Sequence, residues 1–131
     1  VKFNLKYFMA KILIIEDNQI MADNFTLILK GFFDIECINS AEGAMDIINK
    51  NLPDIIILDV LLNGHSAFAL LNELQSYQDT ANIPIIICSN LANHLDMKTI
   101  RHYSVHKVID KSVITPDILI NSCREIGANF K

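Results

Sequence analysis

The sequence predicts a single α/β domain built on a doubly wound, five-stranded parallel sheet with five helices. Two observations predict this architecture. Short aliphatic runs alternate with longer segments of helical periodicity, and the runs are apolar at consecutive positions, as in strands buried on both faces. The 131 residues are 51% apolar and 20% charged, which suits one domain with a complete core and excludes a disordered chain.

The first half of the chain predicts two strands, each followed by a helix. Lys11–Ile15 is a compact aliphatic run and is expected to form the first strand. Apolar residues at helical spacing then predict a helix over residues 18–30, which a glycine ends. A short strand is expected at Asp34–Ile38. We expect the next helix over residues 41–50, with Ser40 as its N-cap.

The second half predicts three more strands, each again followed by a helix. Pro53 and Asp54 introduce Ile55–Asp59, the most aliphatic run of the chain. Thr115 is the expected N-cap of the last helix, because a proline and an acidic residue follow it directly. The remaining elements are expected as helices over 67–76, 93–103 and 116–127 and as strands at Ile85–Cys88 and Lys107–Ile109.

Composition limits the classes of function. Eleven Lys and Arg against fifteen Asp and Glu give a net charge of −4, which disfavours direct binding of nucleic acid. The apolar runs are far shorter than the ~20 residues of a membrane span. Three cysteines without metal-type spacing suit a reducing compartment, so we expect a cytoplasmic protein. Residues 1–8 are interpreted as an upstream extension or a remnant of cloning, with the domain itself over residues 9–131.

Polar side chains stand where the predicted strands end. Glu16 and Asp17 follow the first strand, Asp59 ends the third, Ser89 follows the fourth and Lys111 lies just after the fifth. The carboxyl ends of parallel strands meet at one edge of a doubly wound sheet, where such folds place their chemistry. We therefore expect these side chains to converge.

Three carboxylates at one edge require a counter-charge. Like charges about 4 Å apart cost on the order of 4 kcal/mol at an effective dielectric of 20. A divalent cation removes this cost, and ligands that are all oxygen atoms favour Mg²⁺. With the ammonium of Lys111 and the hydroxyl of Ser89 nearby, the edge is suited to hold a phosphoryl group on one carboxylate.

Four motifs resemble those of the receiver domain of two-component response regulators. They are KILIIED at residues 11–17, PDIIILD at 53–59, PIIICS at 84–89 and DKS at 110–112. Each is weak alone, but their order and spacing together are specific, and the resemblance covers essentially residues 11–130. It implies a flavodoxin-like sheet with the strand order 2-1-3-4-5.

The resemblance also implies a role for each site residue. Asp59 would accept a phosphoryl group from a histidine kinase or a histidine phosphotransfer protein, Lys111 would pair with the phosphoryl oxygens, and Ser89 would hydrogen-bond to one of them. The Mg²⁺ ligands would be the carboxylates of Asp17 and Asp59, Glu16 through a water molecule, and the backbone carbonyl of Leu61. The chain would then be a regulatory domain whose only chemistry is on itself.

The sequence departs from the family pattern at several positions. Asn63 and Ala67 replace a proline and a glycine in the loop after Asp59, and Ser112 replaces the proline after the lysine. Val108 stands where the family usually has Tyr or Phe, the aromatic partner of the hydroxyl in the output switch. This difference motivates an alternative function, a pseudo-receiver that keeps the fold and serves as a protein-docking module.

Two further expectations concern the site and its neighbourhood. Leu61 and Leu91 lie two residues beyond Asp59 and Ser89, at positions that in this family flank the path of the attacking water, so we expect slow self-dephosphorylation. Homodimerisation through the face of the fourth helix, fifth strand and fifth helix is a further option.

Two other functions are disfavoured. A phosphatase with an aspartate nucleophile usually has a second acid two residues after the first, and Leu61 stands there instead. A zinc site built on His102 and His106 lacks acidic or cysteine companions at ligand spacing, and a predicted helix–strand boundary separates the two histidines.

Overall fold

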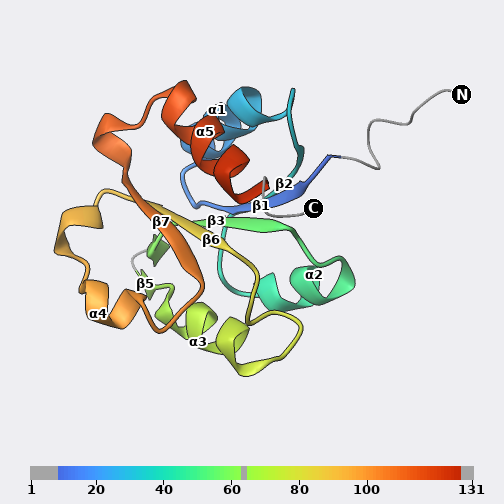
Figure 1. Cartoon of the computed structure of the whole chain (residues 1–131), viewed down its shortest axis with the longest axis vertical. Helices are drawn as coiled ribbons and strands as arrows, with labels where there is room; N and C mark the ends of the chain where they lie inside the picture. The colour runs from blue at the N-terminus through green and yellow to red at the C-terminus, as the bar shows by residue number, and fades with distance from the viewer. Residues whose placement is uncertain (1–8, 63–64, 128–131) are drawn as a thin grey trace, which may run out of the picture.

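The computed structural model describes residues 9–62 and 65–127 and has a five-stranded parallel sheet at its centre (Figure 1). The strand order is β2-β1-β3-β6-β7, and every neighbouring pair is parallel. In chain order this is 2-1-3-4-5, so the predicted fold class and topology are confirmed. The strands are β1 (Lys11–Ile15), β2 (Asp34–Ile38), β3 (Ile55–Leu58), β6 (Ile85–Ser89) and β7 (Val105–Asp110).

Helices cover both faces of the sheet (Figure 1). On one face lie α1 (Gln19–Leu29) and α5 (Pro116–Gly127); on the other lie α2 (Ala44–Lys50), α3 (Phe68–Ser76) and the short α4 (Met97–Ile100). Side chains alternate along each strand, so the sheet separates two apolar clusters. In β1, for example, Leu13 packs toward α2 and α3, while Ile14 packs toward α1 and α5.

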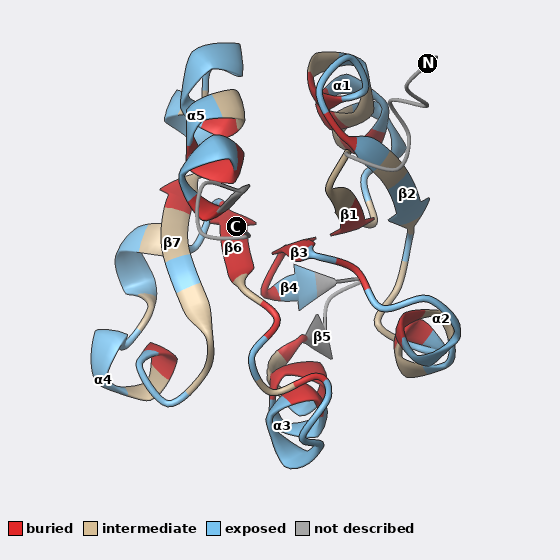
Figure 2. Cartoon of the chain, turned by 45° about the vertical axis from the view of Figure 1, so that its right-hand side comes forward, coloured by how far each residue is buried: buried red, intermediate tan, exposed pale blue. Residues whose placement is uncertain are grey.

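Burial follows the position of each strand in the sheet. The inner strands β1, β3 and β6 are buried almost throughout, whereas the two edge strands β2 and β7 are largely half-buried or exposed (Figure 2). The aliphatic runs therefore form the inner strands, as expected for a parallel sheet covered on both faces.

Polar side chains cap two helices, and the predicted cap at Thr115 is confirmed. Asn18 caps α1, because its side-chain oxygen accepts a hydrogen bond from the N–H of Met21 at 3.1 Å. The hydroxyl oxygen of Thr115 accepts from the N–H of Ile118 at 3.2 Å and caps α5. These caps satisfy backbone donors that the first turn of a helix leaves free.

The predicted start of the second helix is wrong. The helix begins at Ala44 rather than at residue 41, and Ser40 does not cap it. Instead, Gly43 precedes the helix with a left-handed φ of +75°, a conformation that glycine adopts without steric cost. The hydroxyl of Ser40 donates to the carbonyl of Glu42, within the turn that delays the helix.

The single helix predicted over residues 93–103 is also wrong. The structure has a 3₁₀ turn at Ala92–His94 and then the four-residue α4. Asp96 separates them, because its carboxylate accepts from the N–H of Lys98 at 3.0 Å and from the hydroxyl of Thr99 at 3.1 Å. An acidic N-cap in the middle of an apolar pattern starts a new helix.

The last strand is longer than the predicted Lys107–Ile109, because β7 begins at Val105 and ends at Asp110. Ile85 pairs with Val105 and Ile86 with Lys107, so His106 is the extra residue of a β-bulge.

The segment after Asp59, expected to be a loop, contains two short antiparallel strands. They are β4 (Leu61–Leu62) and β5 (His65–Ser66). Asn63 lies outside the described residues, and so does the expected extension at residues 1–8. Across residues 9–62 and 65–127, the structure has no helix of the length and apolarity that a bilayer crossing requires.

Candidate functional site

The register of the sheet brings Glu16 and Asp59 together. Ile15 of β1 pairs with Leu58 of β3, so the residues that follow these two are neighbours at the carboxyl edge. The N–H of Asp59 donates to the carbonyl of Ile15 at 3.3 Å, and the N–H of Glu16 donates to the carbonyl of Ile38 at 3.0 Å. Both backbones are therefore fixed by the sheet, and only the side chains extend beyond it.

Glu16, Asp17 and Asp59 form a carboxylate cluster at this edge. One carboxylate oxygen from each residue lies within 4.8 Å of the others. Glu16 and Asp59 are only 2% and 8% exposed. Three oxygen donors so close together, two of them buried, fit a hard divalent cation such as Mg²⁺. The predicted convergence of the three carboxylates is confirmed.

Lys111 supplies a positive charge to the cluster. Ser89 of β6 is opposite Asp110 of β7 in the sheet, which places Lys111 just beyond the carboxyl edge. Its ammonium nitrogen Nζ lies 2.6 Å from Oδ2 of Asp59 and also forms an ion pair with Oε1 of Glu16. The ammonium thus bridges two buried carboxylates and offsets their mutual repulsion.

The ionisation of these groups reflects the balance between burial and pairing. Burial raises the pKa of Glu16, and hydrogen bonds from Lys111 and from the N–H of Asn18 offset this only in part. Burial alone would lower the pKa of Lys111, but its hydrogen bonds to Asp59 and Glu16 outweigh that effect, so its pKa is raised. Lys111 is therefore held as a cation, and the cluster favours positive charge.

Two further polar contacts organise the edge. The hydroxyl oxygen of buried Ser89 accepts a hydrogen bond from the N–H of Leu91 at 3.0 Å. In the same way, Oδ1 of Asp59 accepts from the N–H of Leu61 at 3.2 Å. The side chains of Leu61 and Leu91 are exposed. Each polar side chain is thus oriented by the amide two residues further on, and an exposed leucine accompanies it.

The structure therefore brings Glu16, Asp17, Asp59 and Lys111 into one cluster. Ser89 and Leu61 stand at the same carboxyl edge of the sheet. The expected roles of these residues in binding a cation or a phosphoryl group stay predictions.

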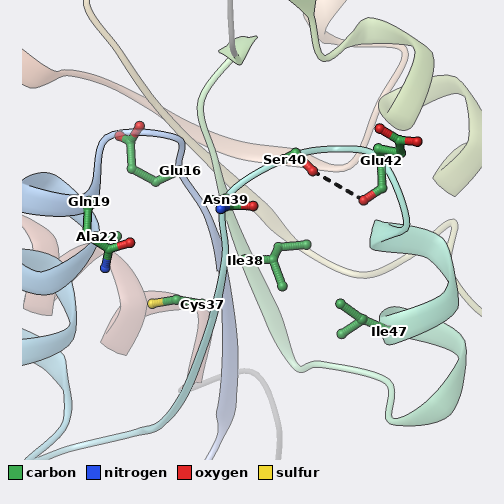
Figure 3. Close-up of a pocket in the computed structure, with 9 residues that line it drawn as sticks. All are labelled: Glu16, Gln19, Ala22, Cys37, Ile38, Asn39, Ser40, Glu42 and Ile47. Carbon is green, nitrogen blue, oxygen red and sulfur yellow. Dashed lines mark hydrogen bonds between the residues drawn. The ribbon is translucent and has the colours of Figure 1, made fainter.

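A cavity next to Glu16 was not predicted from the sequence (Figure 3). It has a volume of about 390 Å³ and lies between α1, β2 and the turn before α2. Figure 3 shows the hydrogen bond from the hydroxyl of Ser40 to the carbonyl of Glu42, two of the residues that line it. No motif indicates this cavity, because its lining side chains come from several separate elements of the chain. Its lining residues are Glu16, Gln19, Ala22, Cys37, Ile38, Asn39, Ser40, Glu42 and Ile47.

Comparisons with known proteins agree with this geometry. Residues 12–123 match the family described as the response regulator receiver domain. The transcriptional regulatory protein YvrH of Bacillus subtilis is 33% identical over 72 residues, which are 53% of this chain and 30% of that protein. The chain spans about a third of the length of the curated relatives it matches.

Solved structures share the fold. A sensor protein from Polaromonas sp. JS666 superposes with a TM-score of 0.83 at 24% identity, covering 93% of this chain and 98% of that one. A response regulator receiver domain from Methylobacillus flagellatus gives a TM-score of 0.77 at 21% identity, covering 90% and 98%.

Proposed function

The chain belongs to the response regulator receiver domain family, and from this premise we propose that Asp59 accepts a phosphoryl group in two-component signalling. The family is regulatory and phospho-accepting rather than a class of enzymes acting on other substrates. The observation that carries the proposal is the contact of 2.6 Å between Nζ of Lys111 and Oδ2 of Asp59 within the carboxylate cluster. The donor would be the phosphohistidine of a histidine kinase or of a histidine phosphotransfer protein.

In the proposed reaction, a carboxylate oxygen of Asp59 attacks phosphorus. A new P–O bond forms, the P–N bond to histidine breaks, and the leaving imidazole nitrogen takes the electron pair. Lys111 neutralises charge on the phosphoryl oxygens, and the hydroxyl of Ser89 is available to donate to one of them. Such positioning and charge neutralisation supply most of the catalysis of phosphoryl transfer.

The carboxylate cluster is the proposed Mg²⁺ site. Asp17 and Asp59 would bind the ion directly, Glu16 through a water molecule, and Leu61 through its backbone carbonyl. When bound, the ion would neutralise charge on both the carboxylates and the phosphoryl group. Lys111 already forms ion pairs with Glu16 and Asp59. These pairs show that the two carboxylates accept a cation as a partner, which supports a site where Mg²⁺ takes over some of these contacts.

Exposed apolar side chains near the site support docking of a partner protein. Ile20, in the first turn of α1, is 80% exposed, and Val113, two residues after Lys111, is 64% exposed. Both lie within three residues of a cluster residue in the sequence, Asp17 and Lys111 respectively, so we propose that the partner covers them when it approaches Asp59. Large apolar side chains left in water near a site are typical of protein interaction surfaces.

The aliphatic side chains of Leu61 and Leu91 support a long-lived acyl phosphate. Their amides orient Asp59 and Ser89, which fixes both leucines at the edge of the site. Neither side chain has a polar group that could orient an attacking water molecule. We therefore propose slow self-dephosphorylation.

A pseudo-receiver that only docks a partner is the second candidate. Val108 favours it, because this half-buried side chain is too small to act as an aromatic switch.

Titration with beryllofluoride and Mg²⁺, followed by calorimetry, separates the two candidates. Wild type should bind saturably as an acyl phosphate mimic forms on Asp59, and Asp59→Asn should not bind. Asp79→Asn removes an exposed carboxylate outside the cluster and serves as the matched control. Equal binding by Asp59→Asn contradicts the assignment of the acceptor, and a flat titration of the folded wild type favours the pseudo-receiver.

A further inference from the structure

The cavity beside Glu16 has the size of a small-molecule site. We call it the β2 cavity, because it lies around the end of β2, and Figure 3 labels the nine residues that line it. Its volume of about 390 Å³ lies within the range of about 300–1,000 Å³ that is usual for ligand pockets. It stands near the carboxyl edge of the sheet, where open α/β folds bind their ligands.

The charges that line the β2 cavity favour a cationic ligand. None of the nine residues is Lys, Arg or His, whereas two are glutamates, Glu16 on the α1 side and Glu42 on the α2 side (Figure 3). Glu16 belongs to the carboxylate cluster, which holds three carboxylates and one ammonium, so that side lies in a negative potential. Within residues 9–62 and 65–127, the exposed carboxylate of Glu42 has no ion pair.

The polar side chains of the lining already use hydrogen-bond donors within the protein. The hydroxyl of Ser40 donates to the carbonyl of Glu42 at 3.3 Å. The side-chain amide of Gln19 donates to Oδ1 of Asp23 at 2.7 Å. What the lining offers a ligand is therefore mainly acceptors, and these suit the N–H donors of an ammonium group.

Aliphatic side chains complete the lining. Ala22 of α1, Ile38 of β2 and Ile47 of α2 contribute them. The thiol of Cys37 lies 3.0 Å from the hydroxyl oxygen of Thr26, and that hydroxyl donates to the backbone carbonyl of Ala22 at 2.8 Å, so the thiol is the donor to Thr26. A methylene chain can therefore cross the cavity without burying a polar group that lacks a partner.

We propose that the β2 cavity binds a linear aliphatic diamine. One ammonium group pairs with Glu42, the other is drawn toward Glu16, and the methylene chain lies against the aliphatic side chains. A negative charge on each of two sides selects this dication over a molecule with a single ammonium group, including a lysine side chain of a partner protein. The inference goes beyond the proposed function, because binding requires neither Mg²⁺ nor a phosphoryl group.

Protection of Cys37 from alkylation tests the proposal on the whole chain in EDTA. This exposed thiol lines the cavity, whereas Cys88 and Cys123 are buried, so its modification by uncharged iodoacetamide reports on occupancy. 1,4-Diaminobutane should slow the modification saturably, as followed by mass spectrometry. Its dissociation constant should be at least about tenfold lower than those of 1-aminobutane and 1,4-butanediol at equal ionic strength. Protein unfolded in urea should show no protection, which excludes consumption of the reagent by the amine.

The length of the diamine gives a second test. The fold fixes the separation between the two glutamates, so linear diamines of increasing length should show one best length. Attraction to net negative charge alone would give the same affinity at every length.

Two variants, each with a matched control, locate the binding. Ala22→Leu fills the cavity and should weaken diamine binding by about tenfold or more. Glu42→Gln removes one exposed carboxylate and should weaken it by about threefold. Ala69→Leu and Glu73→Gln make the same changes at exposed positions of α3 and should have no effect. Circular dichroism checks that each variant is folded.

Several results would overturn the proposal. They are an absence of protection, equal protection by the monoamine or the diol, equal affinity for diamines of every length, and a dissociation constant that either folded cavity variant leaves unchanged. Protection by a lysine-rich peptide but by no diamine would assign the cavity to a partner protein, and would equally overturn it.

Discussion

Replacing Lys111 by Met tests the electrostatic balance of the carboxylate cluster. The substitution keeps much of the length of the side chain but removes the ammonium that contacts both Glu16 and Asp59. The two buried carboxylates would then repel, and charges about 4 Å apart cost about 4 kcal/mol at an effective dielectric of 20. Protonation of Glu16 relieves this repulsion, so the pKa of Glu16 should rise further in the variant.

That protonation sets an upper limit on the cost of the repulsion. Keeping a carboxyl with an ordinary pKa of 4.5 neutral at pH 7 costs about 3.4 kcal/mol. At pH 5 the same limit is only about 0.7 kcal/mol. We therefore expect Lys111→Met to lower the free energy of unfolding by about 3 kcal/mol at pH 7 and by less than about 1 kcal/mol at pH 5.

The sign of this pH dependence follows from linkage. A carboxyl whose pKa is raised in the folded state contributes stability below its unfolded pKa, and that stability is lost as the pH rises through the folded pKa. The folded pKa of Glu16 rises further in Lys111→Met. The loss of unfolding free energy in this variant, relative to wild type, should therefore be larger at pH 7 than at pH 5.

Urea unfolding in the presence of EDTA, followed by circular dichroism, measures the effect. Lys30→Met removes an exposed lysine at the end of α1 and is the matched control, with a change within about 0.5 kcal/mol. Millimolar Mg²⁺ should restore part of the stability of Lys111→Met, since it replaces the missing counter-charge. An unfolding free energy equal to that of wild type at pH 7, or the same deficit at both pH values, would refute the reasoning.

The remaining predictions concern the leucine beside Ser89 and the thiols. Leu91→Asn should speed loss of the acyl phosphate roughly tenfold, because one hydrogen bond to the attacking water lowers the barrier by about 1.4 kcal/mol. Release of phosphate measures this rate. Leu52→Asn changes another exposed leucine and should have no effect. Burial raises the pKa of Cys88 and Cys123 to about 12, so at pH 8 iodoacetamide should modify exposed Cys37 alone, which mass spectrometry of the native protein checks. Between pH 9 and 12 the folded protein keeps these two thiols protonated, whereas the unfolded chain loses the protons. The unfolding free energy should therefore fall over this range.

The strands and the site were predictable for the same physical reason. Inner parallel strands must be apolar on both faces, so β1, β3 and β6 appear in the sequence as continuous aliphatic runs. Their last residues mark the carboxyl edge, and the topology then brings Glu16 and Asp59 together. Only the order and approximate ends of the strands are needed for that inference.

The errors arise where a local backbone choice competes with periodicity. The left-handed Gly43 delays α2, and the capping carboxylate of Asp96 divides the predicted fourth helix. An apolar pattern predicts neither event, because it indicates which face of a helix is buried and not where the helix begins.

The β-bulge at His106 has a consequence for solubility. Within residues 9–62 and 65–127, β7 is an edge strand that pairs with β6 alone. A regular strand in that position could recruit the edge of another molecule and begin an aggregate. A bulge twists the strand and breaks its regular hydrogen-bonding repeat, so it discourages such continuation. The side chains of this edge can therefore stay in contact with solvent without the sheet growing from one molecule into the next.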